Sequence, residues 1–249
     1  MKTIRTLLAT ALIASLSAAA LAQTASVPAY TPAEWSAVMR ALPAADAKAG
    51  SALHTQRFCS GCHGPMGLMD AGATPNIAAQ PVEVTVKALF DYRTDRRKGN
   101  GPAAMMTNMT KMLTDADIVN LAAHYACLPA AKADAKAKAQ MTGDKLAQAR
   151  RLEKKGDAAR MITPCGACHG YSAAGNPNLK VPVLHGQLSG YLEATLRHYR
   201  SGERTTDILS EMRFFAKSLT DEEIALLAAY YASMDTAARP EDCSETSAK

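Results

Sequence analysis

Two copies of one five-residue pattern hold the residue types in this chain that are best suited to chemistry. The pattern is Cys-x-x-Cys-His, and its members are Cys59, Cys62 and His63 in the first half and Cys165, Cys168 and His169 in the second. Two thiols about one helical turn apart can add across the two vinyl groups of one porphyrin, and the histidine that follows can ligate its iron. The two copies therefore predict two covalently bound haem c groups, with the four cysteines as attachment points and the two histidines as iron ligands.

Two other uses of paired cysteines fit the pattern less well. Structural zinc sites are often built from Cys-x-x-Cys pairs, but they do not require a histidine directly after the second cysteine in both copies. A redox dithiol of the thioredoxin kind needs a βαβ context, and the patterning described below is helical. We therefore favour haem over zinc and over redox thiols.

The N-terminus has the features of an export signal. Residues 1–22 read MKTIRTLLATALIASLSAAALA, with a basic start, an apolar stretch and a small-residue exit. This pattern predicts a signal peptide that is cleaved before Gln23. The apolar stretch is shorter than the ~20 residues that span a bilayer, which makes an uncleaved anchor the weaker alternative. We expect a periplasmic protein, in agreement with the attachment of haem c outside the cytoplasm.

Two cysteines remain after the haem motifs are assigned. Cys127 and Cys243 would meet oxidising conditions after export, where disulfides form and persist. A disulfide between them would tie the C-terminal tail to the end of the first domain. Two free thiols are the alternative, because sequence separation alone does not show that the geometry permits a bond.

The formal charge of +5 does not indicate a nucleic-acid partner. Removal of Lys2 and Arg5 with the signal peptide leaves +3, and the propionates of two haems bring the holoprotein close to neutral. A docking surface for a redox partner would then be a local patch. Aromatic residues make up only 5% of the chain, so two buried porphyrins would supply bulk that the cores otherwise lack.

An internal repeat organises the chain. Residues 113–126 match residues 219–232 at the same offset of 106 that separates the two haem motifs. This duplication predicts an N-terminal extension (23–48), a first domain (49–129), an Ala/Lys-rich linker (130–142) and a second domain with a C-terminal tail (143–249). The extension contains the only tryptophan, Trp35, and has no counterpart in the second half.

Helical signals recur in both copies. Thr114 with Asp117, and Thr220 with Glu223, form capping boxes ahead of apolar residues at helical spacing. Upstream, apolar residues at the same spacing predict helices through 86–93 and 192–199, and a third helix leads into each haem motif near 51–58 and 144–155. No convincing alternating strand appears. The fold class is therefore all-α, with two tandem domains that each wrap around a haem.

A methionine in each half is the predicted second iron ligand. Methionine ligation keeps a c-type iron low-spin and raises its reduction potential. Met212 is the single methionine between His169 and the last helix, seven residues before Leu219, and Met106 stands seven residues before Leu113. Met105 is the runner-up, followed by Met109 and Met112, and the alternative is that these methionines fill gaps in the core.

The remaining histidines are weaker candidates for iron ligation. They lack a histidine at the matching position of the other copy, so duplicated domains would need different ligands to use them. We expect packing or surface roles for them: His54, His124, His185 and His198.

Two further matched sets have the chemistry to support a haem. Pro75 and Pro182 follow the histidines by 12 and 13 residues, and each proline carbonyl could accept the outer N–H of its histidine. An ordinary loop proline is the alternative. A second set could bond haem propionates or form a solvated helix end: Tyr92, Arg93, Arg97, Tyr199, Arg200 and Arg204.

On these motifs the chain resembles the dihaem class I cytochromes c, and most closely the cytochrome c-four family, over about residues 48–235. The resemblance rests on the two C-x-x-C-H-G runs, the proline loops, the Y-R-x-x-x-R segments and a methionine before each L-T-D helix. It implies two domains related by a pseudo-twofold axis, with haem propionate edges that meet at the interface. It also implies electron transfer from a cytochrome bc complex or a dehydrogenase to a terminal oxidase.

Three functions follow from these observations, and we favour the first. It is a periplasmic electron carrier without substrate chemistry, which meets redox protein partners and can associate peripherally with membrane respiratory complexes. The second is the cytochrome subunit of a periplasmic dehydrogenase, such as a flavoprotein. The third is a dihaem enzyme such as a peroxidase, and the matched Met106 and Met212 argue against it, because such an enzyme needs an open iron site.

Overall fold

The computed structural model describes residues 27–72 and 74–235. Within these ranges the chain forms helices and no extended strand; two isolated bridges, Asp157 with Ile162 and Asn176 with Val181, are the only β pairings there. No helix in the described ranges has the length and apolar character needed to cross a membrane. The predicted signal peptide (1–22), Cys243 and the tail from residue 236 lie outside the described residues.

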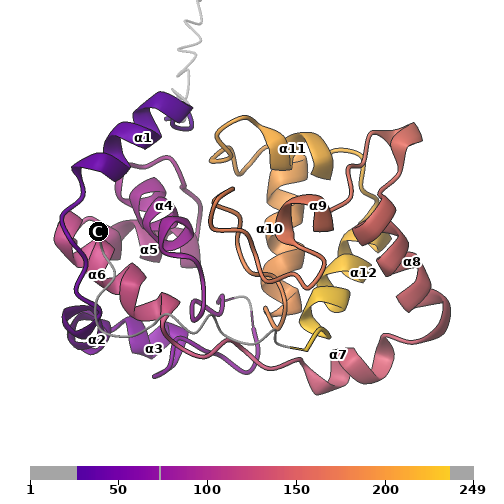
Figure 1. Cartoon of the computed structure of the whole chain (residues 1–249), viewed down its shortest axis with the longest axis horizontal. Coiled ribbons are helices and arrows are strands. Elements are labelled where there is room, and N and C mark those ends of the chain that lie inside the picture. The colour runs from indigo at the N-terminus through magenta and orange to yellow at the C-terminus, as the bar shows by residue number, and fades with distance from the viewer. Residues whose placement is uncertain (1–26, 73, 236–249) are drawn as a thin grey trace, which may run out of the picture.

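The described chain forms two halves that lie side by side, each with the same order of five helices (Figure 1). The first half contains α2 (Ala47–Gln56), α3 (Cys59–His63), α4 (Val82–Arg93), α5 (Pro102–Thr110) and α6 (Asp115–Ala126). The second half contains α8 (Gly143–Lys155), α9 (Gly166–His169), α10 (Ser189–Ser201), α11 (Glu211–Ala216) and α12 (Asp221–Ala232). The predicted all-α fold with two repeated domains is confirmed.

The last helix of each half begins at its predicted capping box. The Thr114 side chain accepts a hydrogen bond from the Asp117 backbone N–H, and Thr220 accepts one from Glu223 in the same way. In return, each acidic side chain accepts a hydrogen bond from the backbone N–H of its threonine. Each helix then buries its apolar face: α6 packs against α2 and α4, and α12 packs against α8 and α10. Ile118 and Ile224, both fully buried, lie at the centres of these two cores.

The N-terminal extension completes the first core. It forms α1 (Pro32–Ala41), which begins at a third capping box, Thr31 with Glu34. The Trp35 side chain on α1 is 1% exposed, and its ring centroid lies 5.4 Å from that of Tyr30 and 6.0 Å from that of Phe90 on α4. Large aromatic contacts of this kind contribute strongly to core stability. The extension, for which the sequence predicted no role, is therefore part of the packing of the first half.

The linker between the halves is attached to the second domain. Its C-terminal part forms the short helix α7 (Ala135–Gln140), which packs against α12. The Asp134 N–H donates to the Ala232 carbonyl over 2.8 Å, and Met141 is buried in the second core. Of the two forms expected for the linker, a semi-rigid helix or a solvated segment, the structure adopts the helix in this part.

Replacement of Trp35 by alanine tests the role of the extension. Trp35→Ala removes a fully buried ring and leaves a cavity between α1 and α4, so we expect the free energy of unfolding of the first domain to fall by about 3–5 kcal/mol. Denaturant unfolding of the holoprotein would measure this loss. Arg40→Ala, on the exposed side of α1, should stay within about 0.5 kcal/mol of the parent; an equally small effect of Trp35→Ala would show that the extension does not support the core.

Candidate haem sites

The two Cys-x-x-Cys-His motifs form single helical turns. Cys59 and Cys62 lie on α3, and Cys165 is the residue that caps α9, on which Cys168 lies. Residues three apart in a helix share a face, so each pair of thiols points to the same side. Among the described residues, no disulfide joins any of these four cysteines, and no three His, Cys, Asp or Glu side chains gather as they do around a zinc ion. The shared face of each thiol pair is compatible with attachment of a haem, which stays a prediction.

The two motif histidines are buried and oriented alike. His63 and His169 are each 7% exposed. The Nδ1 atom of His63 lies 2.9 Å from the Pro75 carbonyl oxygen, and that of His169 lies 3.0 Å from the Pro182 oxygen. Because a carbonyl only accepts, Nδ1 carries the proton, and the lone pair of Nε2 is left for a metal. The predicted role of the two prolines is confirmed.

The pKa values of these two histidines also suit the expected role of iron ligands. Burial lowers the pKa of both imidazoles, against the opposing effect of the hydrogen bond to the proline carbonyl. The neutral ring is the form that binds iron. The carbonyl bond fixes the orientation of the ring and raises the basicity of Nε2, as is usual for metal-ligating histidines.

The methionines divide into half-buried and exposed ones. Met106, on α5, packs against the first core, and Met212, on α11, packs against the second. Met105 and Met112 are 57% and 54% exposed, which favours Met106 as the ligand over both. Met109 is half-buried as well, so it remains the competing candidate in the first half.

The other histidines have structural roles or exposed positions. Both ring nitrogens of His54 are occupied, because Nδ1 lies 2.9 Å from the Tyr125 hydroxyl and Nε2 lies 3.0 Å from the Gly64 carbonyl. The His124 ring lies beside it, with centroids 5.9 Å apart. His198 lies 3.6 Å from Glu203 at the surface, and His185 is buried. The packing and surface roles expected from the sequence agree with these positions.

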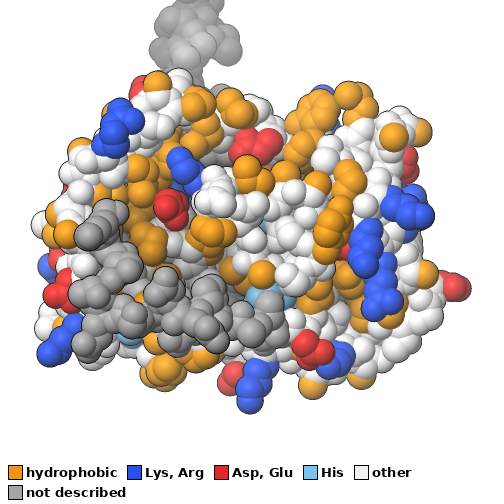
Figure 2. Space-filling view, viewed as in Figure 1, with side chains coloured by type: hydrophobic (Ala, Val, Ile, Leu, Met, Phe, Trp, Pro, Cys, Tyr) orange, Lys and Arg blue, Asp and Glu red, His pale blue; other side chains and the backbone are white. Residues whose placement is uncertain are grey.

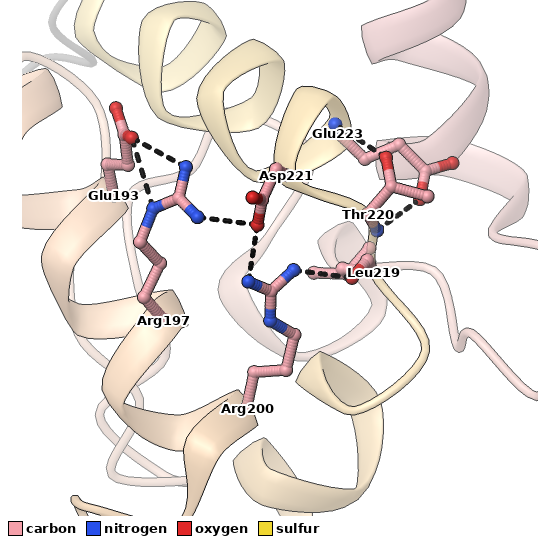
Figure 3. A network of polar contacts seen from close by, with 7 residues as sticks. All are labelled: Glu193, Arg197, Arg200, Leu219, Thr220, Asp221 and Glu223. Carbon is pink, nitrogen blue, oxygen red and sulfur yellow. Dashed lines mark hydrogen bonds and ion pairs between the residues drawn. The ribbon is translucent and has the colours of Figure 1, made fainter.

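One arginine of each Y-R-x-x-x-R segment fastens two helices together. In Figure 3, Arg200 on α10 donates to the Leu219 carbonyl and pairs with Asp221 at the start of α12. Arg93 on α4 repeats this arrangement with the Leu113 carbonyl and Asp115. The structure thus gives these two arginines a role in joining α4 to α6 and α10 to α12, in place of the propionate contact considered from the sequence.

The other arginine of each segment lies at the interface of the halves. The guanidinium groups of Arg97 and Arg204 stack over the rings of Tyr92 and Tyr199, each 4.6 Å from the ring centroid. Arg97 also reaches the Tyr191 hydroxyl of the other half, 3.5 Å away. Among the described residues, no carboxylate forms an ion pair with either of these arginines. Two half-buried guanidinium groups beside phenol rings are suited to bind anionic groups such as propionates.

The lowered pKa of Tyr191 indicates a positive electrostatic potential at this interface. Burial would raise the pKa of its phenol, but the neighbouring charges of Arg97 and Arg204 outweigh that effect and lower the pKa to about 7. A phenol that ionises this readily marks a place where negative charge is stabilised. The residues at the interface therefore fit the acidic edge of a haem.

The two halves differ at one residue near the end of the helix that precedes each haem motif. His54 follows Leu53 near the end of α2, and Glu153 follows Leu152 near the end of α8. Glu153 is completely buried, and neither of its carboxylate oxygens has a hydrogen-bond partner among the described residues. Burial raises the pKa of Glu153, against the charges of Lys154 and Arg150. This unpaired carboxyl was not found from the sequence, where it reads as one more charged residue of an amphipathic helix.

The visible surface shows no large field of one sign. On the face drawn in Figure 2, basic and acidic side chains are scattered, with hydrophobic side chains between them. Charge on this face would thus act locally on an approaching partner and not as a broad attraction.

Comparison with known proteins agrees with this geometry. The family model for cytochrome c matches residues 47–125. A cytochrome c4 from Thiocapsa roseopersicina is 33% identical over 186 residues, which cover 74% of this chain and 91% of that protein. The chain belongs to the cytochrome c4 family.

Two further cytochrome relatives extend the comparison. A thiosulfate dehydrogenase electron acceptor from Thiomonas intermedia is 32% identical over 70% of this chain and 77% of that protein. The crystal structure of reduced cytochrome c4 from Pseudomonas stutzeri superimposes with a TM-score of 0.66 at 27% identity, over 77% of this chain and all of that chain. As a member of the cytochrome c4 family, this protein binds two covalent haem c groups and carries electrons.

The buried carboxyl of Glu153 makes the stability of this cytochrome depend on pH. Since its pKa is raised in the folded state, the native protein retains the carboxyl proton at pH values where the unfolded chain has lost it. Stability from this group is therefore greatest at low pH and falls as the pH rises above the ordinary glutamate pKa. We expect Glu153→Gln to be more stable than the parent at neutral pH, with an advantage that disappears in acid.

Denaturant unfolding of the holoprotein at acidic and neutral pH would measure this difference. Glu222→Gln, on the exposed side of α12, is the matched control and should show no comparable gain. A Glu153→Gln variant whose advantage is the same at both pH values would contradict the assignment.

Proposed function

We propose that His63 with Met106, and His169 with Met212, are the axial ligands of the two haem irons, and that the protein carries electrons between periplasmic partners. When bound, each haem supplies one-electron chemistry at its iron. The observation that carries the ligand assignment is the matched orientation of the two histidines, in which Nδ1 bonds to a proline carbonyl and Nε2 is left for iron. The half-buried Met106 and Met212, at equivalent places in the repeat, support the second ligand.

Each part of the chain has a distinct task in this mechanism. The four motif cysteines anchor the porphyrins through thioether bonds, so that neither haem is lost during repeated oxidation and reduction. The proline carbonyls hold the histidine rings in place. Arg97 and Arg204, which lie at the interface, would hold the haem propionates there.

Outer-sphere transfer follows from this coordination. Iron held by both a histidine and a methionine would have no open position for a substrate, and each haem would then supply outer-sphere electron transfer alone. For this reason we do not propose an enzyme activity. The signal-peptide pattern in residues 1–22 supports the periplasmic location.

A dehydrogenase is the second candidate for a partner. The relative named as an electron acceptor of thiosulfate dehydrogenase supports it. The N-terminal extension does not favour a permanent subunit, because α1 packs into the core of the first half through Trp35. We therefore propose a carrier that exchanges electrons with such enzymes and is not a permanent subunit.

Native purification distinguishes a free carrier from a subunit. We expect the tagged full-length protein, purified from its own cells under gentle conditions, to elute without a stoichiometric catalytic chain, because outer-sphere partners meet briefly. Size-exclusion chromatography with mass determination would test this. A dehydrogenase chain that stays bound in a fixed ratio through the column would support the subunit.

Methionine variants test the proposed ligands. The oxidised protein should contain two haems per chain and show the weak sulfur-to-iron absorption band at the red end of its spectrum. Met106→Leu and Met212→Leu should each remove about half of this band, because each replaces one of two sulfur ligands. Met105→Leu, at an exposed neighbouring position, is the matched control and should retain the full band.

Other results of this experiment would change the assignment. Loss of half the band in Met109→Leu and not in Met106→Leu would move the first ligand to Met109. A parent protein without the band, or with a high-spin component that binds small ligands, would contradict the carrier and favour an enzyme.

A further inference from the structure

The interface contains a reciprocal arrangement of two glutamines. Each haem-side proline is followed by a residue whose backbone N–H and C=O both bond to a glutamine side chain of the other half. These residues are Asn76 after Pro75 and Val183 after Pro182, and the glutamines are Gln187 and Gln80. The loop that orients each histidine is therefore held from across the interface.

The first of these clamps is buried. The Asn76 N–H donates to Oε1 of Gln187 over 2.8 Å, and Nε2 of Gln187 donates to the Asn76 carbonyl over 2.7 Å. Asn76 and Gln187 are each 5% exposed. The amide uses one donor and one acceptor on the same residue, which fixes both the position and the direction of that backbone segment.

The second clamp repeats the first with the halves exchanged. The Val183 N–H donates to Oε1 of Gln80 over 3.0 Å, and Nε2 of Gln80 donates to the Val183 carbonyl over 3.1 Å. Asn76 and Val183 are separated by the same 107 residues as Gln80 and Gln187. The arrangement therefore follows the pseudo-twofold relation of the halves.

Each glutamine is fixed to the last helix of its own half. The residue before Gln80, Ala79, donates its N–H to the Tyr125 carbonyl on α6 over 2.8 Å, and Gly186 donates to Tyr231 on α12 over 3.0 Å. Both Ala79 and Gly186 have positive φ, 59° and 65°. A Cβ at Gly186 would lie 2.3 Å from the Ala131 carbonyl oxygen, so glycine is required there. The glutamines thus project from rigid turns.

We propose that Gln80 and Gln187 are positioning residues that act crosswise: Gln187 sets the strength of His63 as an iron ligand, and Gln80 sets that of His169. The inference rests on the proposed function in one respect, that these histidines ligate the irons. The path has three steps: the glutamine holds the residue after the proline, this holds the proline carbonyl, and the carbonyl holds Nδ1–H of the histidine.

The direction of the effect follows from the hydrogen bond. A well-aligned carbonyl acceptor makes the imidazole a stronger electron donor, which stabilises ferric iron and lowers the reduction potential. Loss of the clamp lets the carbonyl move away from Nδ1, so the ligand weakens and the potential rises. The haem that responds lies in the domain that does not contain the substitution.

The two clamps are not equal in strength. The Asn76 side chain adds a third bond across the interface, from its Nδ2 to the Gly186 carbonyl over 3.1 Å, and accepts from the Met69 N–H over 2.7 Å. Val183 has no polar side chain that could do the same. Because the side-chain bond remains when Gln187 is replaced, the loop beside His63 keeps one tether, whereas the loop beside His169 loses both of its glutamine bonds in a Gln80 variant.

Redox titration of the two haems in glutamine variants tests the proposal. In the holoprotein, Gln187→Leu should raise the potential of the His63 haem, and Gln80→Leu should raise that of the His169 haem. We expect changes of up to about tenfold in the ferric–ferrous equilibrium, which corresponds to ~59 mV for one electron. NMR can assign each potential through contacts between the haem methyl protons and the ring of the histidine on that haem.

Controls and alternative outcomes make the test decisive. Gln56→Leu and Gln148→Leu, at exposed positions on α2 and α8, should leave both potentials unchanged. A shift confined to the haem of the substituted half, equal shifts of both haems, or no shift would each overturn the crosswise role. If Gln187→Leu does not yield holoprotein, Gln80→Leu carries the same test for the other haem.

The test also separates the two proposals. If the sulfur-to-iron band of the parent persists in the variants while the potentials do not respond, the clamp proposal fails and the carrier stands. If the parent lacks that band, the assignment of Met106 and Met212 as iron ligands is wrong. A crosswise shift of the potentials would then still support the positioning role of Gln80 and Gln187.

Discussion

The hydrogen bond between Nδ1 of each buried histidine and a proline carbonyl is the interaction on which the rest of the structure depends. A histidine that is to bind iron through Nε2 must be neutral, must carry its proton on Nδ1 and must not rotate. Burial supplies the neutral ring, and the carbonyls of Pro75 and Pro182 supply the acceptor. The carbonyl can do this only if its loop is itself held, and neither domain holds that loop with its own side chains alone. The orientation of the Nε2 lone pair of each histidine therefore depends on contacts across the interface between the halves.

Both halves of the repeat have the hydrogen bond between histidine and proline carbonyl, but they differ in the residues around it. Both halves retain the motif turn, the proline loop and the arginine that joins α4 to α6 or α10 to α12. Where the first half has His54, bonded at both ring nitrogens, the second has the unpaired carboxyl of Glu153. The first half also gained Trp35 on an added helix. His54 and Glu153 lie beside the haem motifs, where His54 bonds to the Gly64 carbonyl and Glu153 lies next to Gly166, so the surroundings of the two motifs are unequal.

Local patterns in the sequence were enough to predict the features that depend on neighbouring residues. The capping boxes at Thr114 and Thr220 marked the starts of α6 and α12, and the spacing of Pro75 and Pro182 from the histidines predicted the carbonyl bonds. Features that depend on distant backbone were not predictable in the same way. Gln80 and Gln187 stand at matched positions of the repeat, but their partners are main-chain atoms more than a hundred positions away. Every residue type carries such main-chain atoms, so the sequence does not identify these partners. For Arg93 and Arg200 the sequence left open a propionate contact or a solvated helix end, because it does not show that the start of another helix lies beside them. The burial of Trp35 and of Glu153 depends on tertiary packing, which overrides the local polarity pattern.

The reciprocal clamps change how a two-domain carrier should be understood. If each domain held its own histidine, the halves would be two independent one-electron carriers joined by a linker. Here the loop that orients each histidine is bonded to the opposite half, and Arg97 and Arg204 meet at the same interface, where they lower the pKa of Tyr191 to about 7, against the effect of its burial. A change in the bond at one histidine is therefore transmitted to backbone that the other half holds in place. On the proposed function the interface would have two tasks, since it would hold the haem propionates through Arg97 and Arg204 and would couple the ligand strength of each iron to the packing of the other domain. A separated domain would lose the clamp on its own haem loop, and on our proposal the potentials of the intact protein would then be properties of the pair.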